Sequence, residues 1–217
     1  MITGPPSALP RNARTRLLHR RLSRRTALGG LLATTMLALA NRGRTSPQSA
    51  TPAASTLLPR DILLPVEAVQ DVIPGITSEV GTGPNLTTMG TPTTNRSVTY
   101  ARQDGAHRVV LSVDRYATAR DAQHAFDAAL AATREVPGVT TEAVSGLGEA
   151  ALIGVVTQGS ETHVGGGALF GTLIVSATLQ TFDGTDENKA RAAELIRIQA
   201  EHAAGALGLS PVATPTA

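Results

Sequence analysis

Side chains that could do chemistry are few in this sequence, and none of the common catalytic motifs is present. The 217 residues include no cysteine, which excludes disulfides, thiol catalysis, thiolate metal sites and a lipid-modified cysteine. Lys189 is the only lysine, and no phosphate-binding G-x-x-x-x-G-K-[ST] loop surrounds it. Neither H-E-x-x-H nor G-x-S-x-G occurs. The sequence therefore predicts no catalytic, cofactor-binding or metal-ligating residues, and no cofactor.

Histidines are the remaining chemical candidates, and the sequence favours structural roles for them. His124 has Asp121 and Asp127 at three-residue spacing on an expected helix, where the three could be weak metal ligands. That side of the helix lies opposite Phe126, so a solvated charged face is the favoured interpretation.

A hydrolase whose site is assembled from residues far apart in the sequence is the alternative. Glu161 and His163 are two apart on an expected strand and therefore share one face. A triad of Ser112, a histidine and an aspartate can be assembled only by free choice among distant residues. Convergence of titratable groups in one pocket, with perturbed pKa values, would favour an enzyme; the groups concerned are His107, His163, Glu161, Asp114 and Glu149.

One compact motif, Gly146-Leu147-Gly148-Glu149-Ala150, predicts a turn before a new strand. Its two glycines permit positive φ angles, and the Glu149 carboxylate could hold the turn by accepting backbone N–H groups. The glycine-rich residues 159–171 are flanked by strand patterns and open no helix. A turn or a bulged strand is therefore favoured there over a phosphate cradle.

The N-terminal region predicts export. Residues 11–25 carry seven arginines and no acid, and residues 27–40 form an uncharged run rich in Ala, Leu, Gly and Thr. The run ends in Ala38-Leu39-Ala40, an A-x-A site. This order is typical of a secretory signal peptide over residues 1–40, with cleavage between Ala40 and Asn41.

The signal also resembles the twin-arginine type, through Ser23-Arg24-Arg25 and Leu28. That resemblance implies the twin-arginine export machinery as a partner and folding before export. An uncleaved membrane anchor over residues 27–40, or a basic helix that is no signal, are the alternatives. The excess of arginine before the run orients the rest of the chain outward in both signal interpretations. We expect an extracytoplasmic protein, secreted or in the cell envelope, with membrane contact only through an uncleaved signal segment.

The charge distribution argues against nucleic acid as a partner. Ten of the 19 basic residues lie in residues 1–60, where there is no acid. Residues 61–217 therefore hold 9 basic against 17 acidic residues, a net charge of −8. Binding to phosphate backbones needs a basic face, which this region does not provide.

The domain boundaries follow from composition. Residues 41–60 are rich in Ser, Thr, Pro and Ala and predict a disordered linker, and residues 210–217 predict a disordered tail. Residues 61–209 are expected to form a single domain. Its expected elements are a helix over 63–73, a loop over 76–95, hairpin strands over 96–102 and 107–116 around Asp104-Gly105, a helix over 118–136, strands over 140–144, 150–157, 163–170 and 172–181, and a helix over 186–207.

These elements predict an α+β fold, a two-layer sandwich of one mainly antiparallel sheet with two long helices on one face. A weak internal echo supports the arrangement, because Val110-Leu111-Ser112-Val113 and Ile174-Val175-Ser176-Ala177 each precede a long helix. The match is too short to establish duplication. The expected core residues are Val109, Leu111, Phe126, Leu130, Ile174, Leu179, Leu195 and Ile196.

Residues 61–207 resemble a group of exported actinobacterial envelope proteins, mostly lipoproteins, built around a domain of unknown function. They also resemble the extracellular sensor domains of mycobacterial receptor kinases. The features that carry the resemblance are the opening segment from Leu63 to Gly75, the Asp104-Gly105 hairpin, the helix with a central Ala125-Phe126, the Gly-Leu-Gly-Glu-Ala turn at 146–150 and an amphipathic C-terminal helix. Those relatives often carry a lipid-anchor cysteine and a disulfide, which this chain cannot form.

The resemblance implies a binding or sensing module and supplies no catalytic residues. We therefore expect an exported, non-catalytic binding or sensor-like domain whose partner is an unidentified envelope ligand or protein. The extracytoplasmic hydrolase stays open as the alternative.

Overall fold

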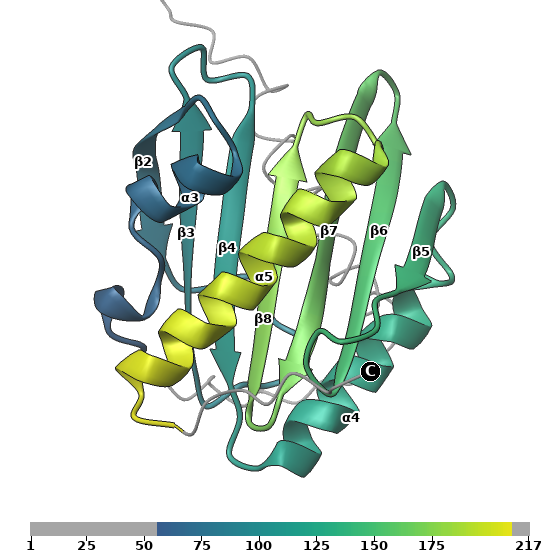
Figure 1. Ribbon diagram of the computed structural model, residues 1–217. Coiled ribbons are helices and arrows are strands. Elements are labelled where there is room, and N and C mark those ends of the chain that lie inside the picture. The colour runs from purple at the N-terminus through teal and green to yellow at the C-terminus, as the bar shows by residue number, and fades with distance from the viewer. Residues whose placement is uncertain (1–55, 210–217) are drawn as a thin grey trace, which may run out of the picture.

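Eight strands of the described residues, 56–209, form one sheet in the computed structural model of the chain (Figure 1). The sheet order is β1-β3-β4-β8-β7-β6-β5, with β2 also paired to β3. All pairs are antiparallel except β1 with β3. The strands are β1 (Thr56–Leu57), β2 (Ile76–Gly83), β3 (Thr94–Arg102), β4 (Arg108–Arg115), β5 (Val139–Ala143), β6 (Ala150–Gln158), β7 (Glu161–Phe170) and β8 (Leu173–Gln180).

The helices are the short η2 (Arg60–Ile62) and α3 (Val66–Val72) and the long α4 (Ala119–Thr133) and α5 (Asp186–Ala206). The predicted α+β class with one mainly antiparallel sheet is confirmed. No helix within residues 56–209 is long and apolar enough to cross a membrane. The predicted signal and cleavage residues lie outside the described residues, as does the predicted tail; they are Ser23, Arg24, Arg25, Leu28, Ala38, Ala40 and Asn41.

Local sequence signals explain the central elements. The β3–β4 hairpin turns at Asp104-Gly105, where Asp104 Oδ1 accepts the Ala106 N–H at 2.9 Å and Gly105 has φ 68°. Helix α4 begins after Thr118, whose hydroxyl accepts the Asp121 N–H at 3.1 Å. The predicted hairpin and both long helices are confirmed within a few residues at their ends.

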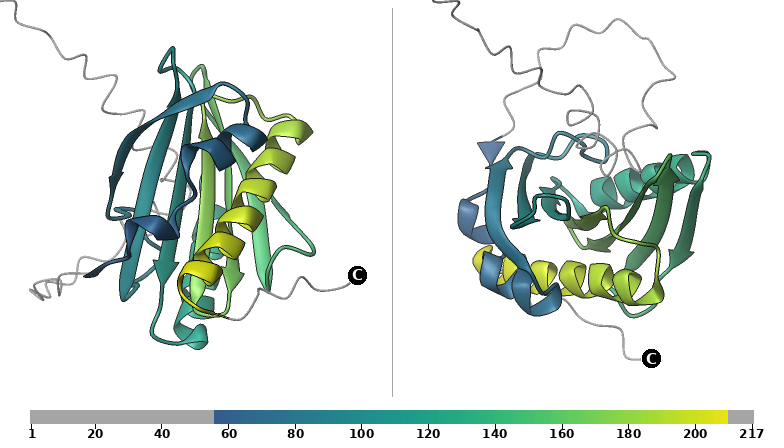
Figure 2. Two further views of the ribbon diagram at one scale, coloured as in Figure 1. Left: turned by 60° about the vertical axis from the view of Figure 1, so that its left-hand side comes forward. Right: turned by 90° about the horizontal axis from the view of Figure 1, so that it is seen from above.

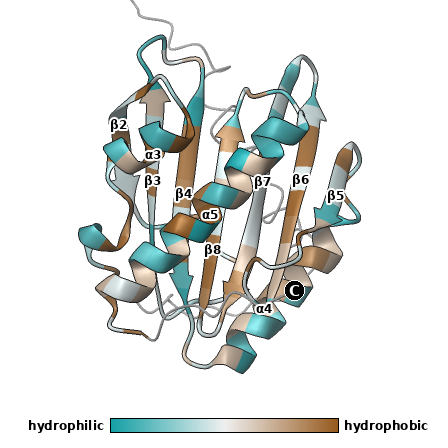
Figure 3. Ribbon diagram, viewed as in Figure 1, coloured by the Kyte–Doolittle hydropathy of each residue, from teal (hydrophilic) through white to brown (hydrophobic). Residues whose placement is uncertain are grey.

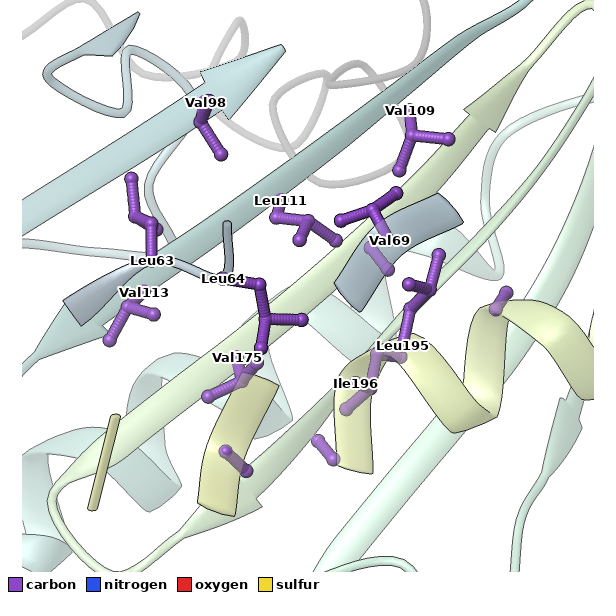
Figure 4. Close-up of a cluster of buried hydrophobic side chains, with 14 of the residues drawn as sticks. Leu63, Leu64, Val69, Val98, Val109, Leu111, Val113, Val175, Leu195 and Ile196 are labelled. Atoms are coloured by element: carbon purple, nitrogen blue, oxygen red, sulfur yellow. The ribbon is translucent and has the colours of Figure 1, made fainter. Parts of the chain in front are cut away.

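Helix α5 packs across one face of the sheet and forms the main core there. Leu195 and Ile196 of α5 are fully buried against alternate residues of β4 and β8, such as Val109 and Val175 (Figure 4). Hydrophobic residues are concentrated along β4, β6 and β8 (Figure 3). Of the predicted core residues, only Leu130 is partly rather than fully buried.

A buried glutamine joins α5 to the N-terminal part of the domain. Gln199 Nε2 donates to the Ile62 carbonyl at 2.7 Å, and its Oε1 accepts the Leu64 N–H at 3.0 Å. Both bonds satisfy backbone groups that would otherwise be buried without partners. Gln199 therefore fixes the segment between η2 and α3 against the C-terminal helix.

Helix α4 lies on the opposite face of the sheet from α5, so the expectation that both long helices share one face is corrected (Figure 2). Phe126 of α4 is in a cluster with Leu152, Leu169 and Ile174, whereas their neighbours Ile153, Ala168 and Val175 face the α5 core. Successive side chains of a strand point to opposite faces, so apolar residues at consecutive positions serve both layers.

Residues 76–83, predicted as part of a loop, form strand β2. Only Ile76 of this strand is buried, so the segment lacks the alternation that indicates a strand. It pairs with β3 at the sheet edge, with two register irregularities. The predicted linker also overlaps the domain, because β1 and the start of η2 lie within residues 56–60.

Candidate functional site

A groove lies on the face of the sheet opposite α5, where α4 leaves the strands uncovered. Its empty space is about 620 Å³, a figure that includes the part open to solvent. The β2–β3 connection, residues 84–93, forms one side of it. The residues that line this groove are Asn85, Thr87, Met89, Val110, Ser112, Asp114, Leu152, Val156, His163, Gly165, Gly166, Ser176 and Thr178.

Strand register explains why the groove is hollow. Ser112 of β4 lies opposite Ser176 of β8, which in turn lies opposite Gly167 of β7. The next row contains Val110, Thr178 and Gly165. Because the β7 positions of both rows are glycines, β7 contributes no side chain to the centre of this face.

At the α4 end of the groove, Asp114 is a buried carboxylate held by one amide. Its side chain is 3% exposed, and Asn85 Nδ2 donates to both carboxylate oxygens, at 3.0 and 3.1 Å. Burial raises the pKa of Asp114 to about 7, which the Asn85 hydrogen bonds only partly oppose. Asp114 is therefore close to half-protonated at neutral pH.

The same contacts fix residues 84–93 over the sheet. The Asn85 N–H donates to Asn95 Oδ1 at 2.9 Å, and the Tyr116 hydroxyl donates to the Met89 carbonyl. Met89 is buried against the α4 cluster, whereas Leu86 is 87% exposed beside the groove. The segment thus presents one large apolar side chain to solvent next to the opening.

In the middle of the groove, two serine hydroxyls contact each other across the β4–β8 pair. Ser112 Oγ and Ser176 Oγ are 2.5 Å apart, and either can be the donor. Ser112 is 5% exposed. This pair unites the two sequence segments that echo each other, since the serines occupy matching positions in them.

At the far end, His163 is buried with one ring nitrogen unpaired. Its Nδ1 accepts the Thr181 N–H at 3.2 Å, so the neutral ring carries its proton on Nε2. Within residues 56–209, Nε2 has no hydrogen-bond partner, and the Glu161 carboxylate lies 3.9 Å away. Burial lowers the pKa of His163, and Glu161 opposes this shift. The ring is therefore neutral at pH 7.

The residue that donates to His163, Thr181, has a strained backbone. Thr181 has φ 63° and is the one non-glycine residue in the described part of the chain with a positive φ. Its hydroxyl donates to the Ala106 carbonyl in the β3–β4 turn. This contact holds the strained residue where its N–H reaches His163.

The structure brings His163 and Asp114 into one groove, but at opposite ends of it. Asp114 lies in the row of Ile174 and Leu169, six residues along β7 from His163, which is roughly 20 Å. Ser112 is separated from His163 by four residues in the strand direction, roughly 13 Å, and by two strands across the sheet, roughly 10 Å. His163 is therefore far from both Ser112 and Asp114, and the triad that free choice among distant residues would combine is not assembled.

The other predicted candidates have structural roles. Glu149 Oε1 accepts the Gly171 N–H at 2.7 Å, and Gly146 and Gly148 have φ of 77° and 65°, which confirms the predicted turn. The His107 ring packs edge-on against Phe182, with centroids 5.0 Å apart. Neither residue lines the groove.

The helical candidates are surface groups. His124 is exposed on α4, and Asp121 is part of the N-terminal cap of that helix. Lys189 Nζ lies 3.4 Å from Glu142 and 3.0 Å from Asp186. In residues 56–209 no three His, Cys, Asp or Glu side chains are grouped so that they could hold a metal ion.

Comparisons with known proteins find similarity to solved structures but no relatives by sequence. No family model matches the chain, and no curated protein matches it. Among solved structures, the chain is similar to the extracellular domain of PknH from Mycobacterium tuberculosis, with 12% identity and a TM-score of 0.45. The match covers 64% of this chain and 93% of that one.

Proposed function

We propose that this chain is an exported, non-catalytic binding module that holds an elongated small molecule in the groove. The observation that carries the proposal is the composition and layout of the groove. Apolar side chains and hydroxyls line it along its length, while its two titratable groups stand at opposite ends. Such a surface can bind and orient a molecule but has no paired groups to transfer protons.

The location outside the cytoplasm is the second part of the proposal. It is supported by the basic region, the apolar run and the A-x-A site of residues 1–40. The acidic balance of residues 61–217 agrees with a partner other than nucleic acid. An anchor over residues 27–40 would give the same orientation with the domain held at the membrane.

Export has a direct test. N-terminal sequencing of the secreted protein is expected to begin at or near Asn41. A variant with Arg24→Lys and Arg25→Lys keeps the charge but loses the twin-arginine pair, so it is expected to stay in the cytoplasm. Cytoplasmic wild-type protein with Met1 intact would contradict export, and a membrane-bound chain that retains residues 27–40 would identify the anchor.

Ligand binding can be followed at Met89. The chain has three methionines, and Met89 is the one that lies in the described domain, where it lines the groove. With ¹³C-methyl methionine, we expect groove ligands to shift the Met89 methyl resonance in a saturable manner while the resonances of Met1 and Met36 stay unchanged. The Met89→Leu variant assigns the signal. An unchanged Met89 signal across a ligand panel that includes envelope extracts would contradict a binding groove.

The hydrolase alternative has one observation in its favour. Ser112, Asp114 and His163 do line the same groove, and the pKa values of the last two are shifted. Turnover of any substrate in a broad ester, amide and glycoside panel, abolished by His163→Ala in a folded protein, would replace the binding proposal. The separations given by the strand register lead us to expect no turnover.

A further inference from the structure

We propose that the ligand of the groove is an uncharged aliphatic molecule with a carbonyl oxygen, such as an acyl ester or amide, and that the Ser112–Ser176 hydroxyl pair binds that oxygen. This inference rests on the proposed function, because it names the ligand class of the same groove. It follows from the charge, the hydrogen-bonding capacity and the apolar character of the lining residues.

The charge of the lining argues against an anionic ligand. None of the described residues that line the groove is lysine or arginine. The titratable groups in the lining are Asp114 at one end and neutral His163 at the other, with Glu161 beside His163. Arg108 of β4 is in the row of His163 but is not part of the lining. A phosphate, sulfate or carboxylate in the groove would therefore lose its hydration and gain no cation from the lining.

The lining also offers little to a cationic ligand. Asp114 is 3% exposed, and both of its carboxylate oxygens already accept from Asn85. An ammonium group would have to displace that amide and detach residues 84–93 from β4. The ligand that fits the groove as built is therefore uncharged.

Hydrogen-bond counting assigns a spare donor to the serine pair. Two hydroxyls carry two protons, and the contact between Ser112 and Ser176 uses one of them. Within residues 56–209, no second acceptor contacts either hydroxyl. One O–H is thus free to donate, in a part-buried position where a carbonyl oxygen would be its natural partner.

Apolar groups surround this donor. Met89 belongs to the α4 cluster, Leu152 is in the row of the two serines on β6, and Val110 and Val156 lie toward His163. No phenylalanine, tyrosine or tryptophan of the described domain lines the groove, so it has no ring for a sugar or a base to stack on. A carbonyl with an aliphatic chain on each side is the chemistry that fits this groove, whose Asp114 and His163 ends are roughly 20 Å apart.

The test uses a matched pair of probes, 1-decanoylglycerol and 1-O-decylglycerol, both below their micelle concentrations. The ester has the carbonyl that the ether lacks. Titration of the full chain, followed by the Met89 methyl resonance, is expected to show binding of both probes. We expect the ester to bind about two- to tenfold more tightly, the range for one neutral hydrogen bond.

Variants locate the origin of that preference. In Ser112→Ala the Ser176 hydroxyl is free to donate to the ligand, and in Ser176→Ala the Ser112 hydroxyl is. Each single variant is therefore expected to keep the preference for the ester. The double variant has no hydroxyl donor at this position, and its affinities for the two probes are expected to become equal. Ser97→Ala is the matched control, because Ser97 lies beside Ser112 in the same row but outside the groove lining.

The two proposals fail in different ways. Equal affinity of the wild type for both probes, or a double variant that still prefers the ester, overturns the carbonyl assignment but leaves the groove as a binding site. Tighter binding of the decanoate anion than of the ester overturns the uncharged class. If neither decyl probe shifts Met89 while another molecule does, the aliphatic class is wrong; if nothing shifts it, the groove itself is not a ligand site.

Discussion

The free energy of unfolding of the wild type is expected to fall between pH 4 and pH 8, and the Asp114→Asn variant is expected not to show this fall. The folded-state pKa of Asp114 is raised from 3.8 to about 7, so the folded protein holds this proton more tightly than the unfolded chain. The stabilisation is complete below pH 3.8 and is lost as the pH rises through 7. Three pKa units correspond to about 4 kcal/mol, which sets the upper size of the effect.

The measurement is urea unfolding of the wild type and Asp114→Asn at several pH values. Comparison at each pH isolates Asp114, because both proteins contain His163, whose lowered pKa acts in the opposite direction, with stability lost as the pH falls below 6.5. Tyr116 also lies near the carboxylate, and burial raises its pKa further above neutrality. Parallel stability curves for the two proteins would show that Asp114 titrates normally.

Truncation of Phe126 to alanine is expected to lower the free energy of unfolding by about 3–5 kcal/mol. The side chain is 2% exposed and fills the space between α4 and the sheet, against Leu169 and Ile174. Met89 and Leu152, which line the groove, belong to the same cluster. The cavity left by the ring therefore borders the binding site, and the Met89 methyl resonance should move as well.

His124→Ala is the matched control for this experiment. It truncates an exposed ring on the same helix, so its effect on stability should stay within about 0.5 kcal/mol. Chemical denaturation followed by circular dichroism checks both variants. A loss of less than about 1 kcal/mol for Phe126→Ala would mean that α4 does not pack on the sheet as described.

Local signals in the sequence predict most elements of the domain, but not the side of the sheet on which each helix lies. The Asp104-Gly105 turn and the Thr118 cap are short-range features, and both are found. The face covered by α4 depends on long-range packing. The consecutive apolar residues of β6 and β8 do indicate strands that are buried on both faces, which requires a covering layer on each side of the sheet. Strand β2 was missed because an exposed edge strand has no alternation to detect.

The groove could not be predicted from spacing alone, because its residues come from four strands and one connection. Alternation along β4 places Ser112 and Asp114 together on the face opposite the α5 core, where a solvent-exposed aspartate would be the ordinary expectation. Asp114 is buried because residues 84–93 cover it, and that segment has no regular pattern. The predicted pairing of Glu161 with His163 on one face is confirmed by their 3.9 Å separation.

Strand β7 contains three consecutive glycines, Gly165 to Gly167, and a side chain would have different contacts at neighbouring positions among them. Gly166 shares its face with Val164 and Ala168 of the α5 core, and a Cβ there would lie 2.1 Å from the Leu152 carbonyl oxygen of β6. A Cβ at Gly167 would have ordinary van der Waals contacts, at 3.4 Å with the end of the flexible Met89 side chain and with the Val175 carbonyl oxygen, and at 3.7 Å with Ser176 Cβ. Alanine at 166 should therefore disturb strand pairing and folding, whereas alanine at 167 should narrow the space for a ligand. Ligand size and fold stability can thus be altered separately by changes one residue apart.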